Sequence, residues 1–177
     1  ALMGATALLL ITRKDPHEAL RDVEWSTLFF FVGLFIVVQG LDHTGVLERV
    51  GELAADASGG SLLTATMLIL WLSAVLSGVI DNIPYTATML PVVRTLGDDL
   101  GGNDSTAKVL WWALAMGADL GGNLTVIGAS ANVLVSNLAA RAGQPITFWE
   151  WFKQGLPATI ITIAISALYL WLRFLAF

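Results

Sequence analysis

The sequence predicts an all-α integral membrane protein, and three observations support this fold class. Hydrophobic residues make up 56% of the chain and charged residues only 13%, whereas a soluble domain carries roughly a quarter charged residues. The apolar residues are gathered in long stretches, and a membrane-spanning helix needs about 20 of them. Two of these stretches are interrupted in the middle by glycine, proline and polar residues. We therefore expect spanning helices together with helices that break inside the membrane.

The N-terminal third of the chain predicts two apolar helices separated by polar residues. Residues 1–11 are too short to span a bilayer and lack the charged leader of a signal peptide, so we interpret them as the end of a truncated helix. A polar loop containing Pro16 follows. Residues 26–47 are then apolar on every side, as expected of a helix embedded in lipid. Residues 48–61 are acidic and then small, and they predict a loop.

The first interrupted stretch, residues 62–96, is too long for one membrane crossing and short for two. Its polar break, Asp81-Asn82-Ile83-Pro84, falls near the middle of the stretch. We expect a re-entrant hairpin whose first arm ends near Ile80. The second arm begins at Pro84, because proline lacks the backbone donor that the first position of a helix leaves unused.

The second interrupted stretch, residues 109–140, is apolar at both ends. Glycine and polar residues fill its middle between Gly117 and Asn132, which indicates a helix broken within the membrane. A loop then leads to tryptophans at 149 and 151, which we interpret as an interface belt. Residues 155–177 predict the last spanning helix.

Composition excludes several classes of function. The chain has no cysteine, which removes disulfides, thiol nucleophiles and cysteine metal sites. With a net charge of -5 and its nine Lys and Arg residues scattered among loops, it offers no basic surface, so we expect the lipid bilayer and no nucleic acid as a partner. A slight excess of basic residues on the side opposite the C-terminus favours a C-terminus outside the cell.

The two breaks imply one polar site. Irregular backbone at membrane depth must be buried in protein or line a polar cavity, because lipid cannot satisfy free amides and carbonyls. Freed helix N-termini attract anions, whereas freed C-termini and carbonyls attract cations. An ionisable side chain inside a membrane costs at least about 2.5–3.5 kcal/mol on insertion scales. Asp81 is therefore the leading candidate for ion binding or proton relay, and it also suits the N-cap of the helix that follows.

The neighbours of Asp81 and the second break add further candidates. Asn82 can offer its oxygen to a cation or its amide to an anion, and Asp119 is either an ion-binding carboxylate or an internal hydrogen-bonding group. Gly121 and Gly122 suit the break itself. Neutral oxygens suited to a hard cation or an oxyanion come from Asn123, Thr125, Ser130 and Asn132. Ser and Thr in membrane helices often bond only to a neighbouring helix, so both readings stay open. Bound Na⁺ is expected at Asn82 and Asn123, and no cofactor is expected other than Na⁺ or H⁺ as a coupling ion.

These residues resemble a known group of transporters. The segment from Leu76 to Pro91 is similar to the second hairpin of the ArsB/NhaD-like members of the ion transporter superfamily, which also contains citrate carriers. It looks closest to the P-protein branch of that superfamily. The segment from Gly121 to Asn132 resembles the second broken helix of the same group, and the resemblance covers nearly the whole chain.

The resemblance implies that residues 1–177 form the C-terminal repeat of an inverted-repeat transporter that works by an elevator-like motion. It implies that the hairpin tip, with Asp81, Asn82 and Pro84, faces an unwound segment across a shared site. The residues of that segment are Gly122, Asn123, Thr125, Gly128, Ser130 and Asn132. The partner N-terminal repeat is missing, so this fragment alone should not transport. Arsenite pumps tend to have an asparagine where this chain has Asp81, which counts against a dedicated arsenite carrier.

The leading hypothesis is secondary active transport of an inorganic ion or small anion, of the arsenite/anion or Na⁺/H⁺ type. We expect coupling to H⁺ or Na⁺, a location in the plasma or inner membrane, and a homodimer. A passive ion channel is an alternative, because half-helix ends also line pores. An intramembrane aspartyl protease is another, because Asp81 and Asp119 could share a proton. Such proteases carry Gly-x-Gly-Asp, however, where this chain has Met116-Gly117-Ala118-Asp119. The substrate stays open between arsenite, Na⁺ against H⁺, chloride and carboxylates.

Overall fold

The computed structural model describes residues 2–13, 15–21, 29, 32–33, 36–37, 39–40, 43–102 and 104–176. The helix predicted at 26–47 lies partly outside the described residues. The chain divides into two compact units, Ala1–Ile36 and Val37–Phe177. The first unit contains α1 (Leu2–Thr12), which is apolar along most of its length, and α2 (Pro16–Arg21). Pro16 begins α2, in the position where a missing backbone donor costs nothing.

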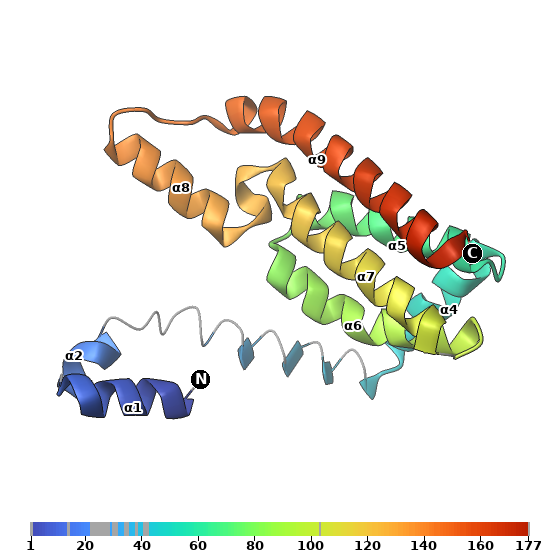
Figure 1. Ribbon diagram of the computed structural model, residues 1–177, viewed down its shortest axis with the longest axis horizontal. Coiled ribbons are helices and arrows are strands. Elements are labelled where there is room, and N and C mark those ends of the chain that lie inside the picture. The colour runs from blue at the N-terminus through green and yellow to red at the C-terminus, as the bar shows by residue number, and fades with distance from the viewer. Residues whose placement is uncertain are drawn as a thin grey trace. The chain divides into compact units, whose positions relative to one another are not determined.

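The second unit holds both predicted breaks, and its regular elements are helices throughout the described residues (Figure 1). They are α4 (Val46–Ser58), α5 (Leu62–Ser77), α6 (Asn82–Asp99), α7 (Asp104–Gly121), α8 (Ser130–Arg141) and α9 (Phe148–Leu170). Two short 3₁₀ turns, η1 (Gly122–Leu124) and η2 (Val126–Gly128), separate α7 from α8, and a π-helical turn, η3 (Trp171–Leu175), ends α9. The all-α prediction is confirmed for this part of the chain.

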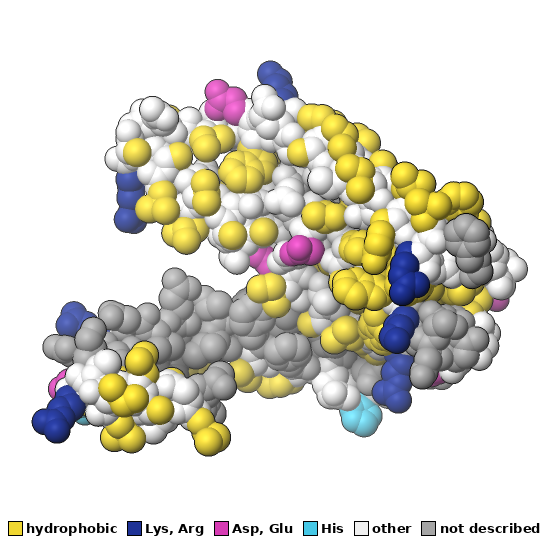
Figure 2. Space-filling model, in the orientation of Figure 1, with side chains coloured by type: hydrophobic (Ala, Val, Ile, Leu, Met, Phe, Trp, Pro, Cys, Tyr) yellow, Lys and Arg dark blue, Asp and Glu magenta, His cyan; other side chains and the backbone are white. Residues whose placement is uncertain are grey.

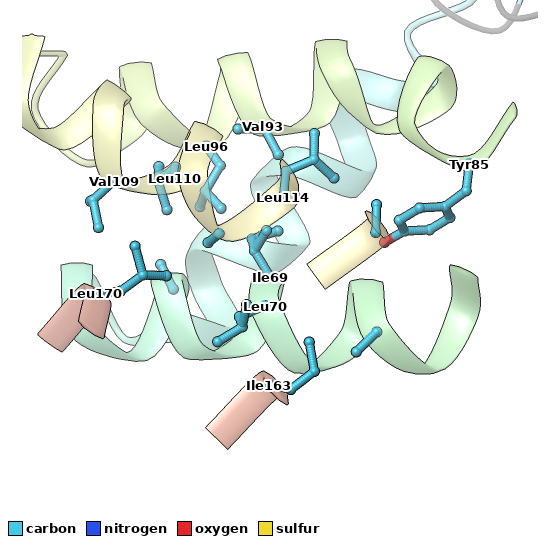
Figure 3. Packing of buried hydrophobic residues seen from close by; sticks show 14 residues of the cluster. Ile69, Leu70, Tyr85, Val93, Leu96, Val109, Leu110, Leu114, Ile163 and Leu170 are labelled. Atoms are coloured by element: carbon cyan, nitrogen blue, oxygen red, sulfur yellow. The ribbon is translucent and has the colours of Figure 1, made fainter. Parts of the chain in front are cut away.

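The core of this unit forms where α7 packs against α5, α6 and α9. Figure 3 shows apolar side chains from all four helices meeting in one cluster. Its fully buried members include Ile69 of α5, Leu96 of α6, Leu110 of α7 and Ile163 of α9. Because lipid tails are as apolar as these side chains, close van der Waals packing holds such helices together in a membrane.

Glycines on α7 allow it to approach α5 closely and set the two helices in register. A Cβ on Gly117 would lie 2.5 Å from the Leu70 carbonyl oxygen, and one on Gly121 would lie 2.5 Å from the Ala74 carbonyl oxygen. The two glycines are four residues apart and so share a helix face, as in the small-residue interfaces of membrane helices. Four residues further along α7, the contact lies four residues further along α5, so the two helices run parallel. Their C-terminal ends, where the two breaks begin, therefore lie side by side.

Residues 48–61, predicted as a loop, are mostly helical, and this prediction was wrong. They belong to α4, which lies between Gly45 (φ 73°) and Gly59 (φ 61°). Gly51 packs against α6 so tightly that a Cβ there would lie 2.8 Å from the Thr95 Cβ. The acidic residues suggested a loop, but they alternate with apolar residues at helical spacing, which makes α4 amphipathic.

The last helix begins earlier than the apolar run from residue 155 predicts. A capping box begins it at Phe148: the Thr147 amide donates to Glu150 Oε2 (2.8 Å) and the Glu150 amide donates to Thr147 Oγ1 (3.3 Å). Of the helices that the structure describes, Phe148–Leu175 is the one long and apolar enough to cross a membrane by itself. The face of this helix that points away from the core carries exposed hydrophobic side chains along its length (Figure 2).

Candidate functional site

The first break is a turn of four residues between α5 and α6. Asp81 is the N-cap of α6, where its Oδ1 accepts a hydrogen bond from the Ile83 amide at 3.1 Å. The predicted cap is therefore present, but the helix begins at Asn82 and not at Pro84. Pro84 is buried in the first turn, among the positions whose backbone donors have no partner within the helix. Asp81 and Asn82 are both half-buried.

The second break interrupts the helix from Gly121 to Ser130. Two residues within it, Thr125 and Ala129, have extended backbone. The Asn132 side chain holds the interruption together, because its Nδ2 donates to the Gly122 carbonyl at 2.9 Å and to the Thr125 carbonyl at 3.0 Å. Asn132 is 8% exposed. It thus supplies a buried donor to carbonyls that the helix break removes from the helical hydrogen-bond ladder.

The two breaks touch each other through Thr125. Its Oγ1 donates to the Gly78 carbonyl at 2.6 Å, across 47 residues of sequence, and accepts from the Gly128 amide at 3.1 Å. One residue before the first break, Ser77 Oγ donates to the Ala118 carbonyl on α7. Two interruptions from different apolar stretches therefore form one polar junction.

Close backbone packing at this junction requires glycine. A Cβ on Gly128 would lie 2.5 Å from the Gly122 carbonyl oxygen, closer than real Cβ contacts come. The Asn82 side chain reaches the same place from α6, because its Nδ2 lies 3.4 Å from the position that a Cβ on Gly122 would occupy. Of the predicted site residues, the structure thus brings together Asn82, Gly122, Thr125, Gly128 and Asn132.

Three other predicted residues have exposed side chains, namely Asp119, Asn123 and Ser130. Among the described residues, no hydrogen bond or ion pair engages these three side chains. A sodium ion shared by Asn82 and Asn123 therefore stays a prediction. Within the described ranges, no three His, Asp or Glu side chains are grouped so that they could hold a metal ion.

Helix α9 contributes contacts that the sequence interpretation missed. Trp151 Nε1 donates to the Asn123 carbonyl at 3.1 Å. One turn later, Gly155 packs on the same segment, where a Cβ would lie 2.6 Å from the Asn123 oxygen and 2.8 Å from the Leu124 oxygen. The sequence interpretation had assigned Trp151 to an interface belt. A tryptophan that donates across 28 residues of sequence has no local pattern that would reveal it.

A second missed contact joins the two arms of the predicted hairpin. The Tyr85 hydroxyl of α6 donates to Ser73 Oγ of α5 at 3.0 Å, and both residues are buried. Buried polar side chains such as these need partners when no water is at hand. The link holds the start of α6 against the last turns of α5, next to the turn that carries Asp81.

An open hollow of about 460 Å³ lies elsewhere, between the ends of α4 and α6 that point away from the breaks. Glu52, Asp56 and Asp99 line it. It contains none of the predicted site residues, so the junction of the two breaks stays the candidate site on the strength of its side-chain geometry.

The electrostatics of the junction differ between its two helix starts. At α6 the Asp81 carboxylate already occupies the N-terminus, so this side favours a cation. At α8 the N-cap residue is Ala129, which provides no side-chain hydrogen bond, so the first two amides of α8 stay available to an anion. One junction thus offers groups for both signs of charge.

Interrupted helices that meet in an apolar, all-helical chain are the features of a membrane transport protein. Comparison with known families agrees: the chain belongs to the citrate transporter family, whose model matches residues 1–117. The resemblance derived from the two motifs is thereby confirmed.

Curated relatives extend the match over nearly the whole chain. It is 51% identical over 174 residues to an uncharacterized transporter of Mycobacterium tuberculosis. The aligned region covers 98% of this chain and 40% of that protein. It is 45% identical to the 46 kDa membrane protein of Mycobacterium leprae, with 98% and 40% covered. It is 40% identical over 178 residues to the human P protein, covering 96% of this chain and 21% of that protein. The chain thus spans less than half the length of these relatives.

Proposed function

We propose that this chain forms one half of the transport site of a secondary active transporter, which carries a small anion across the membrane coupled to Na⁺ or H⁺. The observation that carries the proposal is the junction of the two breaks, where the Thr125 hydroxyl joins the second break to the Gly78 carbonyl of the first. Membership in the citrate transporter family supports it. The other half of the site belongs to a partner repeat outside this sequence.

The lengths of the helices fit breaks that lie inside the membrane. At about 1.5 Å per residue, α5 is about 24 Å long and α6 about 27 Å. Each is shorter than the hydrocarbon core of a bilayer, which is about 30 Å thick. We propose that these two helices, joined by a turn of four residues, form a re-entrant hairpin with Asp81 and Asn82 at its tip.

The free energies involved explain why the residues of this chain alone are insufficient to bind an anion. A helix N-terminus contributes about 0.3–1 kcal/mol to binding a negative charge, and up to about 2 kcal/mol where it is partly buried. Removing an ion from water costs at least several kcal/mol even in a polar protein interior. The start of α8 therefore cannot hold an anion alone. A coupling cation near Asn82 and the opposing repeat supply the remaining stabilisation, which links the movement of the anion to that of the cation.

The test is uptake by the full-length protein reconstituted in liposomes, with radiolabelled citrate as the first probe and arsenite and chloride as further probes. Uptake should be saturable and driven by an imposed Na⁺ or pH gradient. We expect Asn82→Ala to abolish it, because this side chain lies at the junction. Asn137→Ala is the matched control, since Asn137 is exposed on α8. Uptake that does not saturate with substrate and does not depend on the imposed Na⁺ or pH gradient would indicate a channel.

Asp81→Asn separates the charge of Asp81 from its structural role. Asparagine caps a helix about as well as aspartate does, so the variant keeps the bond to the Ile83 amide that begins α6. We expect normal expression in the membrane but loss of gradient-driven uptake. Full uptake by both Asp81→Asn and Asn82→Ala would refute the assignment of the site.

A further inference from the structure

The carbonyls of Asn123 and Leu124 lie where the helical hydrogen-bond ladder stops. In a continuous helix the Asn123 carbonyl would accept from the amide four residues later. Here α7 ends at Gly121 and the backbone at Thr125 is extended. Carbonyls at such an end need donors from elsewhere.

Helix α9 meets both carbonyls with two residues one turn apart. Trp151 supplies an indole N–H to the Asn123 oxygen at 3.1 Å. Gly155 lacks the side chain that would otherwise lie 2.6 Å from the Asn123 oxygen and 2.8 Å from the Leu124 oxygen. Residues four apart share one helix face, so a single face of α9 both donates to the broken segment and lets its backbone come close.

The neighbouring Trp149, also at the start of α9, makes no such contact with the broken segment, and its environment differs from that of Trp151. It is 65% exposed and packs by ring edges against Phe148 and Phe152. That arrangement suits a membrane interface. Trp151 is half-buried and donates its N–H to the Asn123 carbonyl. The two tryptophans therefore have different environments although they are two residues apart.

We infer that Trp151 and Gly155 are positioning residues for the proposed transport site. They fix the peptide that follows Asn123, and this restricts the direction of the exposed Asn123 side chain and ties α9 to the unwound segment. The inference rests on the proposed function for its effect on transport, but the contact itself is measured without transport.

The first experiment compares Trp151→Phe with Trp149→Phe in the full-length protein. Phenylalanine keeps the aromatic bulk and removes the N–H donor, so the two variants differ in whether a hydrogen bond is lost. Loss of one hydrogen bond changes an equilibrium by about threefold to tenfold. We expect Trp151→Phe to raise the KM for Na⁺, or the proton concentration at half-maximal citrate uptake, by that factor. The maximal rate should change much less, and Trp149→Phe should leave both unchanged.

A second readout is independent of the substrate. This chain has no cysteine, so Ile127→Cys, at an exposed position in the broken segment, reports local access to a membrane-impermeant maleimide once cysteines elsewhere in the protein are replaced. We expect Trp151→Phe and Gly155→Ala each to change the labelling rate severalfold. Trp149→Phe and Gly97→Ala, whose new Cβ would meet its nearest neighbour at an ordinary 3.8 Å, should not change it.

The outcomes separate the two proposals. Altered labelling in a protein that transports none of the probes supports the positioning role and refutes the proposed function. Unaltered labelling and an unaltered KM in Trp151→Phe overturn the positioning role. Loss of both Trp151→Phe and Gly155→Ala from the membrane fraction, with both controls retained, would show a purely structural contact and would also overturn it.

Discussion

At the residue scale, Thr125 and Asn132 use their polar atoms to hold broken backbone. Both were predicted as candidates that either contact the transported ion or bond to protein, and their side chains bond to the carbonyls of Gly78, Gly122 and Thr125. Asn82 differs from them, because it lies at the same junction and none of the hydrogen bonds found among the described residues involves its amide. We therefore propose that Asn82 is the side chain of this junction that binds an ion.

Thr125→Val should destabilise the protein. Valine has nearly the shape of threonine but leaves the Gly78 carbonyl without its partner, and the Gly128 amide keeps only its bond to the Thr125 carbonyl. An orphaned buried polar group costs about 1–3 kcal/mol. The midpoint temperature of unfolding, followed in detergent by size-exclusion chromatography after heating, should fall clearly. Thr162→Val is the control, since that hydroxyl bonds only within its own helix. Equal midpoints for the two variants would contradict the prediction.

At this scale the sequence predicts hydrogen bonds between close neighbours in the chain, but it does not predict those between distant residues. The cap at Asp81 follows from a carboxylate placed just before a proline-containing helix start. The bonds from Asn132 depend on the path of two 3₁₀ turns, which no short pattern specifies. The bond from Trp151 to Asn123 depends on the packing of a separate helix.

At the scale of elements, the contact between α5 and α7 decides where both breaks lie. Gly117 and Gly121 bring α7 onto the backbone of α5, and the helices end together. The breaks were predictable because glycine, proline and polar residues interrupt apolar runs. The helix α4 was missed because its acidic residues resemble a loop, and the start of α9 was missed because its capping box precedes the apolar run.

Gly121→Ala should disrupt this packing, whereas Gly97→Ala should not. The new methyl at residue 121 would lie 2.5 Å from the Ala74 Cα and carbonyl oxygen, and backbone atoms cannot move aside independently. Overpacking of this kind typically costs about 1–3 kcal/mol. In Gly97→Ala the methyl has room, and alanine favours the helix by up to about 1 kcal/mol. The effect of each variant is measured by the yield of folded protein and by its midpoint temperature of unfolding. Equal stability of the two variants would argue against close α5–α7 packing.

At the scale of the whole molecule, the position of the broken segment along α9 indicates how deep the site lies in the bilayer. Aromatic residues lie at both of its ends, and Trp149 and Trp171 are separated by about 33 Å at about 1.5 Å per residue. This matches the hydrocarbon thickness of a bilayer, about 30 Å. The broken segment contacts α9 within two turns of Trp149, at Trp151 and Gly155.

We therefore expect the unwound segment to lie nearer to one membrane surface than to the bilayer centre. Spin labels at the exposed positions Trp149, Ile127 and Ile161 would measure depth from their relative collision rates with oxygen and a water-soluble nickel complex. The label at residue 127 should resemble the one at 149 more than the one at 161, which lies near the middle of α9. A depth at residue 127 equal to that at 161 would contradict this arrangement.

The bond between Trp151 and Asn123 also bears on how the protein is made. Ribosomes synthesise Asn123 before Trp151, which comes 28 residues later, so the broken segment leaves the ribosome without its donor. A carbonyl without a partner is poorly tolerated in lipid. The broken helix would therefore wait beside the insertion machinery until α9 arrives, and the two would enter the bilayer as a pair. Variants that weaken the contact would then insert more slowly than the wild-type protein, although the mature protein still reaches the membrane.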